Sequence, residues 1–194
     1  MIIYDKAGEL IDHTKIEPTE QELVREFVKK DDVVLELGAR YGSSSIILNK
    51  IIEGKNIVCV EPDGSVWDSL EKNRQINNCD FNVVKGAISK DKLNISFNDY
   101  ATYTFNDDNG DINIYDLWEL QEKFNLKFNV LVADCEGCLS VFIEHYEEFF
   151  KQLRLVIFEA DGSSICDYKI IFGILYGNGF KSVKSGFHNV FLKN

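Results

Sequence analysis

The sequence predicts one α/β domain with a doubly wound, mostly parallel sheet, helices on both faces and an antiparallel terminal strand. Three observations predict this fold. Short apolar segments alternate with segments of helical spacing, the apolar segments end at glycine or acidic residues, and residues 179–194 form two alternating segments joined by a Lys-Ser-Gly turn. The chain has 194 residues, 45% of them hydrophobic, and residues 1–194 are expected to form a single domain.

The first helix is predicted at Thr19–Lys30. Thr19 is its expected capping residue, Glu22 follows three positions later, and Leu23 and Phe27 belong to an apolar stripe. The second helix begins with serines, which are common at helix amino ends. The predicted helices span residues 19–30, 43–52, 64–78, 111–124, 139–150 and 168–176. The predicted strands span residues 33–37, 56–62, 81–89, 128–134 and 153–161, followed by the terminal hairpin with its turn at residues 184–186.

Residues 93–109 interrupt this alternation because they are polar and aromatic. Their pattern indicates one or two short strands, or an excursion over the edge of the sheet. The aromatic residues Tyr100, Tyr103 and Phe105 could stack on a sugar ring, although aromatics that alternate in a strand more often belong to a core.

Composition and charge exclude several classes of protein. The formal net charge of −11 disfavours a nucleic-acid partner, because phosphate-backbone binding needs clustered Lys and Arg. The first residues do not resemble a signal peptide, and no apolar run approaches the roughly 20 residues of a membrane span. A cytoplasmic protein without a membrane span is therefore expected.

The five cysteines are expected to be reduced. Their number is odd and their spacing irregular, which does not resemble a disulfide framework. Cys135 and Cys138 form a CxxC pair, but a zinc site needs a second pair or histidines at ligand spacing, and none is near.

The predicted strand ends carry the residues best suited to bind a ligand. In open α/β sheets, ligands bind beyond the carboxyl ends of the strands. Glu61 lies about 20 residues after the Gly38 turn, where a carboxylate can accept both ribose hydroxyls. Gly38 and Gly42 let the backbone approach a ligand closely. The strand ends are Glu36 to Gly42, Glu61, Gly86, Asp134 and Glu159.

The turn from Gly38 to Gly42 is neither the GxGxxG of dinucleotide binders nor a P-loop. A pyrophosphate favours a glycine turn aimed at a helix amino terminus, whereas a sulfonium with an amino-acid tail favours nearby acidic and carbonyl oxygens. The acidic strand ends therefore favour S-adenosylmethionine (SAM) over NAD. A nicotinamide-dependent enzyme is the competing interpretation.

The sequence resembles the FkbM-like SAM-dependent methyltransferases over roughly Glu17 to Asp161. The segments that carry the resemblance are Glu17-Pro18, VVLELGARYG, VCVEPDGSVWDSLEKN, VVKGAISKDK and VLVADCEGCL, in which Asp134, Glu136 and Gly137 match the family. The departures are Arg40, Ala133, Cys135 and Cys138. The resemblance implies a Rossmann-like class I methyltransferase fold, whose sheet also ends in an antiparallel strand.

Together the strand ends and the resemblance predict the cofactor site, with residues 1–30 covering the cofactor. The predicted cofactor-binding residues are Glu17, Glu36, Gly38, Ala39, Arg40, Gly42, Ser43, Ser44, Glu61, Pro62, Asp63, Gly86, Ala87, Ile88 and Asp134.

The resemblance also implies O-methyl transfer to a sugar hydroxyl of a glycan or saccharide. Such a hydroxyl needs a base or a metal ion to take or weaken its proton. Asp134, Glu159 and His188 are the catalytic candidates, although His188 could equally be a surface strand residue. Asp161 is a further candidate, unless it caps the following helix. The carboxylates could also hold Mg or Mn.

Other functions stay open at this point. The chain could be a SAM-binding module without catalysis, or a methyltransferase acting on a non-sugar small molecule. It could also work beside, or be linked to, a glycosyltransferase. His145 lies in a helical EHYEE run and is expected on a solvated face.

Overall fold

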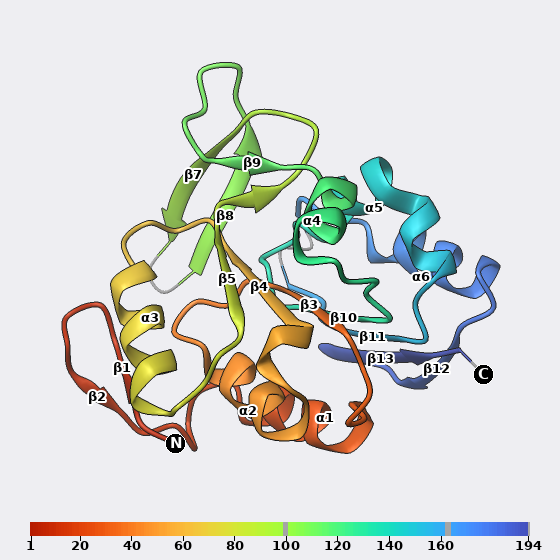
Figure 1. Ribbon diagram of the computed structural model, residues 1–194. Helices are drawn as coiled ribbons and strands as arrows, with labels where there is room; N and C mark the ends of the chain where they lie inside the picture. Colours follow the sequence, from red (N-terminus) through yellow and green to blue (C-terminus); the bar gives the residue numbers. More distant parts are fainter. Residues whose placement is uncertain (99–100, 162–163, 194) are drawn as a thin grey trace.

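A seven-stranded sheet forms the middle layer of the computed structural model, which describes residues 1–98, 101–161 and 164–193 (Figure 1). The strand order is β12-β13-β11-β10-β3-β4-β5. β13 is antiparallel to both of its neighbours, and the other pairs are parallel. The doubly wound sheet with an antiparallel terminal strand is therefore confirmed. The strands are β3 (Val34–Leu37), β4 (Ile57–Glu61), β5 (Asn82–Lys85), β10 (Val130–Ala133), β11 (Leu155–Glu159), β12 (Lys181–Lys184) and β13 (His188–Leu192).

Helices cover both faces of this sheet because successive strand residues point to opposite sides. Val34 and Val130 pack with one helical layer, whereas Leu35 and Leu131 pack with the other. The first layer consists of α1 (Pro18–Phe27), α2 (Ser43–Ile51) and α3 (Trp67–Ile76). The second consists of α4 (Leu117–Phe124), α5 (Leu139–Tyr146) and α6 (Tyr168–Gly177). Two short 3-10 helices, η1 (Gly54–Asn56) and η2 (Glu147–Lys151), precede β4 and follow α5.

The start of α1 differs from the sequence prediction. The helix begins at Pro18 and ends at Phe27, and its N-cap is Glu17 in a left-handed conformation (φ 44°), without a capping bond from its side chain. Proline suits the first helical position because its missing N–H would have no partner there, and it disfavours the helical conformation in the residue before it. Thr19 is therefore not the cap, and the Glu17 side chain is left outside the helix.

The segments around Gly86 and Asn113 were also predicted incorrectly. The third predicted strand divides at Gly86, after which β6 (Ala87–Ile88) pairs with β9 (Ile114–Tyr115) in a separate small sheet. The predicted helix over residues 111–124 begins only at Leu117, because Asp116 accepts hydrogen bonds from the backbone N–H groups of Trp118 and Glu119.

Two hairpins lie outside the main sheet. The excursion at residues 93–109 contains β7 (Leu93–Asn98) paired with β8 (Ala101–Asn106), and this hairpin projects from one end of the molecule (Figure 1). β1 (Ile3–Tyr4) and β2 (Leu10–Ile11) form the leading hairpin. The Asn73 side chain on α3 holds β1 through bonds to the backbone N–H and carbonyl of Tyr4.

An ion pair with a buried carboxylate joins the loops at the amino-terminal ends of three central strands. Arg154 pairs with the buried carboxylate of Asp32, which also accepts a bond from the Asn129 side chain. Asn129 in turn accepts the backbone N–H of Val33. These residues join the loops that precede β3, β10 and β11.

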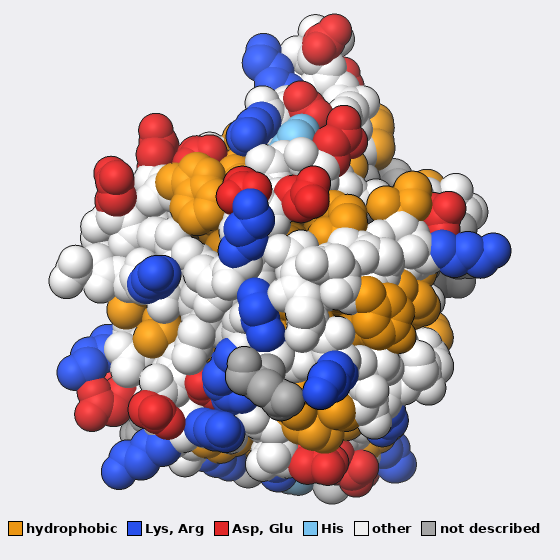
Figure 2. Space-filling model, turned by 90° about the vertical axis from the view of Figure 1, so that its right-hand side faces the viewer, with side chains coloured by type: hydrophobic (Ala, Val, Ile, Leu, Met, Phe, Trp, Pro, Cys, Tyr) orange, Lys and Arg blue, Asp and Glu red, His pale blue; other side chains and the backbone are white. Residues whose placement is uncertain are grey.

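None of the helices formed by the described residues is long and apolar enough to cross a membrane. On the face seen in Figure 2, acidic and basic side chains are interspersed, with hydrophobic side chains in separate patches between them.

Candidate functional site

A cavity of about 780 Å³ opens at the carboxyl ends of β3, β4 and β10, and it has two halves. The sheet half is lined by eight of the predicted cofactor-binding residues, which are Glu17, Gly38, Arg40, Glu61, Pro62, Ala87, Ile88 and Asp134. The hairpin half lies under β8 and beside α5. It is lined by Ser96, Tyr103, Phe105, Glu136, Phe142 and Ile165, together with their neighbours.

The turn after β3 forms the floor of the sheet half. Gly38 has φ +86° and Gly42 has φ +84°, which glycine adopts without a steric penalty. A Cβ on Gly38 would lie 1.7 Å from the Asp134 carbonyl oxygen, so only glycine fits between β3 and β10. Gly38 also donates its N–H to the Val60 carbonyl at 3.0 Å. The turn is thereby fixed against both neighbouring strands.

Glu61, at the end of β4, presents its carboxylate in a fixed orientation. It is only 4% exposed, and it accepts the Arg40 N–H at 2.6 Å and the Asp63 N–H at 2.7 Å, one on each oxygen. A carboxylate has about four acceptor positions, so about two remain for a ligand in the cavity. Burial raises the pKa of Glu61 to about 7.

Three further carboxylates converge beside the floor. One oxygen from each of Glu17, Glu20 and Asp134 lies within 4.8 Å of the other two. Glu20 is only 5% exposed, and its Oε2 has no hydrogen-bond partner among the residues that the structure describes. Burial, followed by the charges of Glu17 and Glu36, raises the pKa of Glu20 well above its ordinary value. Such a cluster can hold a metal ion or an organic cation.

Sequence reasoning missed Glu20, although a signal was present. Glu20 precedes Leu23 by three positions and Val24 by four, so it lies on the buried face of α1. An acidic residue on an apolar helix face is unusual unless it has a partner or a ligand.

Several predicted cofactor-binding residues support the cavity from beneath and do not line it. Glu36 is buried and accepts a bond from Ser45, and burial raises its pKa to about 7. Ser43 donates to Glu17, and Asp63 accepts bonds from Ser65 and Thr102. The predicted residues outside the lining are Glu36, Ala39, Gly42, Ser43, Ser44, Asp63 and Gly86.

The hairpin half combines aromatic rings with hydroxyl and other polar side chains. Tyr103 and Phe105 come from β8, Phe142 comes from α5, and Phe105 is 45% exposed. Tyr100 lies outside the described residues. Glu136 adds a carboxylate to this half, and burial and the nearby Asp161 raise its pKa to about 7. This mixture of rings and a carboxylate can bind a ligand that has both apolar and hydroxylated faces.

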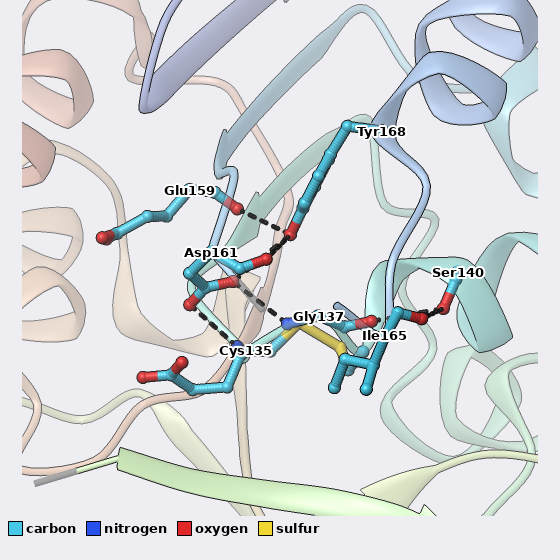
Figure 3. The surroundings of a disulfide bond; sticks show 9 residues. Cys135, Gly137, Ser140, Glu159, Asp161, Ile165 and Tyr168 are labelled. Atoms are coloured by element: carbon cyan, nitrogen blue, oxygen red, sulfur yellow. Dashed lines mark hydrogen bonds between the residues drawn. A yellow bond between two sulfur atoms is a disulfide. The ribbon is translucent and has the colours of Figure 1, made fainter. Parts of the chain in front are cut away.

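The loop between β10 and α5 contains a disulfide, so the prediction of reduced thiols was wrong for Cys135 and Cys138. Only Cys59, Cys79 and Cys166 are free. The spacing was visible in the sequence, but the conformation that brings the two sulfur atoms together was not. Asp161 was a further catalytic candidate, with capping of a following helix as the alternative, and its carboxylate accepts the N–H groups of Glu136 and Gly137 at 3.1 and 3.0 Å (Figure 3).

Two of the predicted catalytic residues lie together outside the cavity lining. His188 on β13 pairs with Glu159 on β11, with Nε2 and Oε2 3.5 Å apart. Burial lowers the pKa of His188, whereas burial and Asp161 raise that of Glu159 to about 7. Asp134 is the one predicted catalytic residue that lines the cavity. His145, expected on a solvated face, is mostly buried and accepts the Lys90 N–H.

The buried carboxyls make the unliganded protein less stable as the pH rises. Glu36 and Glu61 have pKa values raised from 4.5 to about 7, so between these values the folded protein binds protons more strongly than the unfolded chain. The resulting stabilisation is fully present below pH 4.5 and is lost as the pH rises through 7. We expect a melting temperature on the order of 5 °C lower at pH 8 than at pH 6.

Scanning calorimetry at the two pH values measures this difference. Glu20→Gln removes one charge from the cluster and should reduce the difference, whereas Glu53→Gln, at an exposed position, should leave it unchanged. A melting temperature that rises from pH 6 to pH 8 would contradict the prediction.

Comparison with known proteins identifies the fold. No protein-family model and no curated protein matches the chain, but solved structures do. The ribosomal protein L11 methylase from Lactobacillus delbrueckii subsp. bulgaricus matches with a TM-score of 0.52 and 16% identity, over 91% of this chain and 76% of that chain. Precorrin-6y C5,15-methyltransferase from Geobacter metallireducens matches with a TM-score of 0.55 and 13% identity, over 98% and 94% of the two chains.

The magnesium protoporphyrin IX methyltransferase from Synechocystis, solved with bound SAM, matches with a TM-score of 0.53 and 12% identity, over 94% of this chain and 79% of that chain. Likenesses at such low identity establish the fold alone. The chain has the Rossmann-like fold of class I methyltransferases.

Proposed function

We propose that this protein is a SAM-dependent methyltransferase. The observation that carries the proposal is the concentration of buried and partly buried carboxylates around the carboxyl ends of β3, β4 and β10, with the unpartnered oxygen of Glu20 on α1 beside them. Buried carboxylates repel one another strongly at neutral pH unless a cation or protons compensate them. A cationic ligand is therefore the occupant that this site favours.

The residues present fit the parts of SAM. The three oxygens of Glu17, Glu20 and Asp134 are close enough together for one ammonium group to donate to each of them. Glu61 has acceptor positions left for two ribose hydroxyls. The pyrophosphate of NAD would instead meet carboxylates, a repulsion that disfavours the nicotinamide alternative.

The residues around the cavity suit transfer to a hydroxyl group. SAM, when bound, supplies a methyl group on a positively charged sulfur atom. Asp134 lines the cavity, and burial, followed by the charges of Glu20 and Glu17, raises its pKa well above its ordinary value. With one Asp134 oxygen in the cluster of three carboxylates, the other can accept a proton, so Asp134 is our first candidate to take the proton of an attacking hydroxyl. Glu159 and His188 lie outside the cavity lining, so any role of theirs in this proposal is indirect, through Asp134.

A saccharide hydroxyl is the proposed acceptor. The family resemblance supports it, as do Tyr103, Phe105 and Phe142, which offer ring faces on which a sugar can stack. The acceptors named for the compared structures are a ribosomal protein, precorrin-6y and magnesium protoporphyrin IX. The saccharide proposal therefore depends on the resemblance and on the cavity.

Methyl transfer from labelled SAM to a panel of glycans, small phenols, peptides and RNA tests the proposal. We expect label in a saccharide fraction. Label only in another class would overturn the saccharide acceptor and keep the methyltransferase. SAM binding without transfer to any acceptor would favour a non-catalytic module, and binding of NAD in place of SAM would overturn the proposal.

Asp134→Asn should reduce turnover about 100-fold while leaving the melting temperature within a few degrees of the parent, because an amide cannot take the proton. Initial rates with the acceptor that accepts most label measure the effect. Unchanged rates would remove Asp134 from the mechanism.

Addition of EDTA tests whether the carboxylates hold a metal ion instead. Activity that is lost and then restored by Mg or Mn would indicate a metal ion, whereas activity that EDTA does not change would favour direct base catalysis.

A further inference from the structure

We propose that the Cys135–Cys138 disulfide and Asp161 together position Glu136 as the carboxylate that contacts the acceptor, so that acceptor turnover depends on the redox state of this bridge. The inference rests on the proposed function, because it assigns a role within the same cavity. It concerns the hairpin half alone, and it predicts no change in cofactor affinity.

The backbone of Glu136 is held in a conformation that a non-glycine residue rarely adopts. Its φ is +53°, and Gly137 follows with φ +85°. A glutamate in the left-handed region costs on the order of 1 kcal/mol and persists only where its surroundings fix it. Two left-handed residues in succession turn the chain sharply between Cys135 and Cys138, and all four residues of this turn line the cavity.

Asp161 is the first of the two restraints on this turn. Its two carboxylate oxygens accept the consecutive N–H groups of Glu136 and Gly137, one on each oxygen. Tyr168 on α6 donates its hydroxyl to the Asp161 carbonyl at 2.7 Å and lies 3.2 Å from a carboxylate oxygen (Figure 3). The Tyr168 ring stacks on the core residue Phe158. The turn is thus attached to the core through Asp161 and Tyr168.

The disulfide is the second restraint. It joins the first and last residues of the turn, and Figure 3 shows it directly beside the backbone that Asp161 binds. Cys135 and Cys138 are both partly exposed and both line the cavity, so a small thiol can reach them. In a reducing compartment, a disulfide of this kind is more often regulatory than structural.

Reduction by a dithiol has a defined chemical balance. The reductant transfers two electrons and two protons, the S–S bond breaks, two cysteine thiols form, and the dithiol closes into its own cyclic disulfide. Asp161 then holds the turn alone, without the covalent link between its two ends.

Release of the turn would change how Glu136 contacts an acceptor. The groups that face it are Asp161, the Tyr103 hydroxyl on β8 and the Arg40 guanidinium. Asp161 is one of the two restraints on the turn, whereas Tyr103 and Arg40 line the cavity. Loss of the turn would therefore move Glu136 relative to Tyr103, Phe105 and Phe142. Glu61, Glu17 and Glu20 lie on other elements, and Asp134, which precedes the turn, is held to β3 by its own N–H bond to the Leu37 carbonyl.

Hydrogen exchange tests the positioning without any acceptor. The amides of Glu136 and Gly137 are measured in the oxidised protein, in protein reduced with dithiothreitol, and in the Cys135→Ser/Cys138→Ser double variant. We expect exchange at least about tenfold faster in the last two, and also in Asp161→Asn, since both restraints protect these amides. Exchange that does not depend on the bridge would overturn the proposal. Cys79→Ser, which alters a free thiol, is the control and should behave as the parent.

Two further measurements distinguish this proposal from the proposed function. The dissociation constant of S-adenosylhomocysteine, measured by calorimetry, should agree within about twofold in all forms. Loss of binding on reduction would assign the turn to the cofactor and overturn the inference, and failure of the parent to bind would overturn the proposed function instead. With the panel saccharide that accepts most label, reduction and Glu136→Gln should each lower kcat/KM for acceptor about tenfold. Of these two changes, only reduction should accelerate hydrogen exchange at the turn. Unchanged kinetics in Glu136→Gln would remove Glu136 from acceptor binding.

Discussion

Replacement of Glu61 by alanine is expected to weaken binding of S-adenosylhomocysteine about 100-fold. Hydrogen bonds to a charged group contribute about 1.5–3 kcal/mol each, and the Glu61 carboxylate is positioned to accept two of them from a ribose. The loss should appear in the dissociation constant measured by calorimetry.

Two variants control this experiment. Glu61→Gln keeps a carbonyl oxygen for one of the two backbone N–H groups, those of Arg40 and Asp63, that the carboxylate accepts, so it disturbs the turn less than Glu61→Ala does. Glu53→Ala removes an exposed glutamate far from the cavity lining and should bind as tightly as the parent. Parental affinity in Glu61→Ala would show that the ribose assignment is wrong.

Gly38→Ala is expected to destabilise the folded protein by at least about 3 kcal/mol. The added methyl group would lie 1.7 Å from the Asp134 carbonyl oxygen, a distance that forces β3 and β10 apart or rotates the peptide. Overlap with backbone cannot be relieved by a change of rotamer, so the cost exceeds that of an ordinary glycine replacement. Denaturant unfolding measures the change in the free energy of unfolding.

Gly8→Ala is the matched control. Gly8 has φ +81°, close to that of Gly38, but a Cβ at Gly8 would meet no atom within 4 Å. It should therefore cost only about 1 kcal/mol, which is the conformational penalty alone. Equal losses in the two variants would mean that the backbone conformation, and not the approach of β10, requires glycine at position 38.

The succession of strands and helices along the chain could be predicted from the sequence because periodicity is a local signal. Each apolar run that was interpreted as a strand contains one, and Asp134 and Glu159 lie at the carboxyl ends of adjacent strands, directly after β10 and at the end of β11. The predicted boundaries of helices and strands were wrong where a single side chain determines the boundary. Pro18 moved the start of α1, Asp116 delayed α4, and Gly86 divided the third strand.

The site was less predictable because its contacts join residues far apart in the sequence. Glu61 could be located from its spacing, but Glu20 required the knowledge that its helix face is buried against other carboxylates. The contact of Asp161 with Glu136 and Gly137 spans about 25 residues and depends on a turn that no propensity predicts. His188 was expected near the ligand, yet strand pairing places it beside Glu159 instead.

The ion pair of Arg154 with Asp32 lies at the amino-terminal ends of the central strands, opposite the cavity at their carboxyl ends. This separation determines which parts of the protein can change in sequence without loss of the fold. The loops before β3, β10 and β11 are joined there, so the register of the central strands does not depend on the β7–β8 hairpin or on the residues that face a ligand. Loops carried on an independently fixed scaffold can vary with little cost in stability. Changes in the hairpin can therefore alter what the cavity binds while the joined loops and the positions of the strand ends stay unchanged.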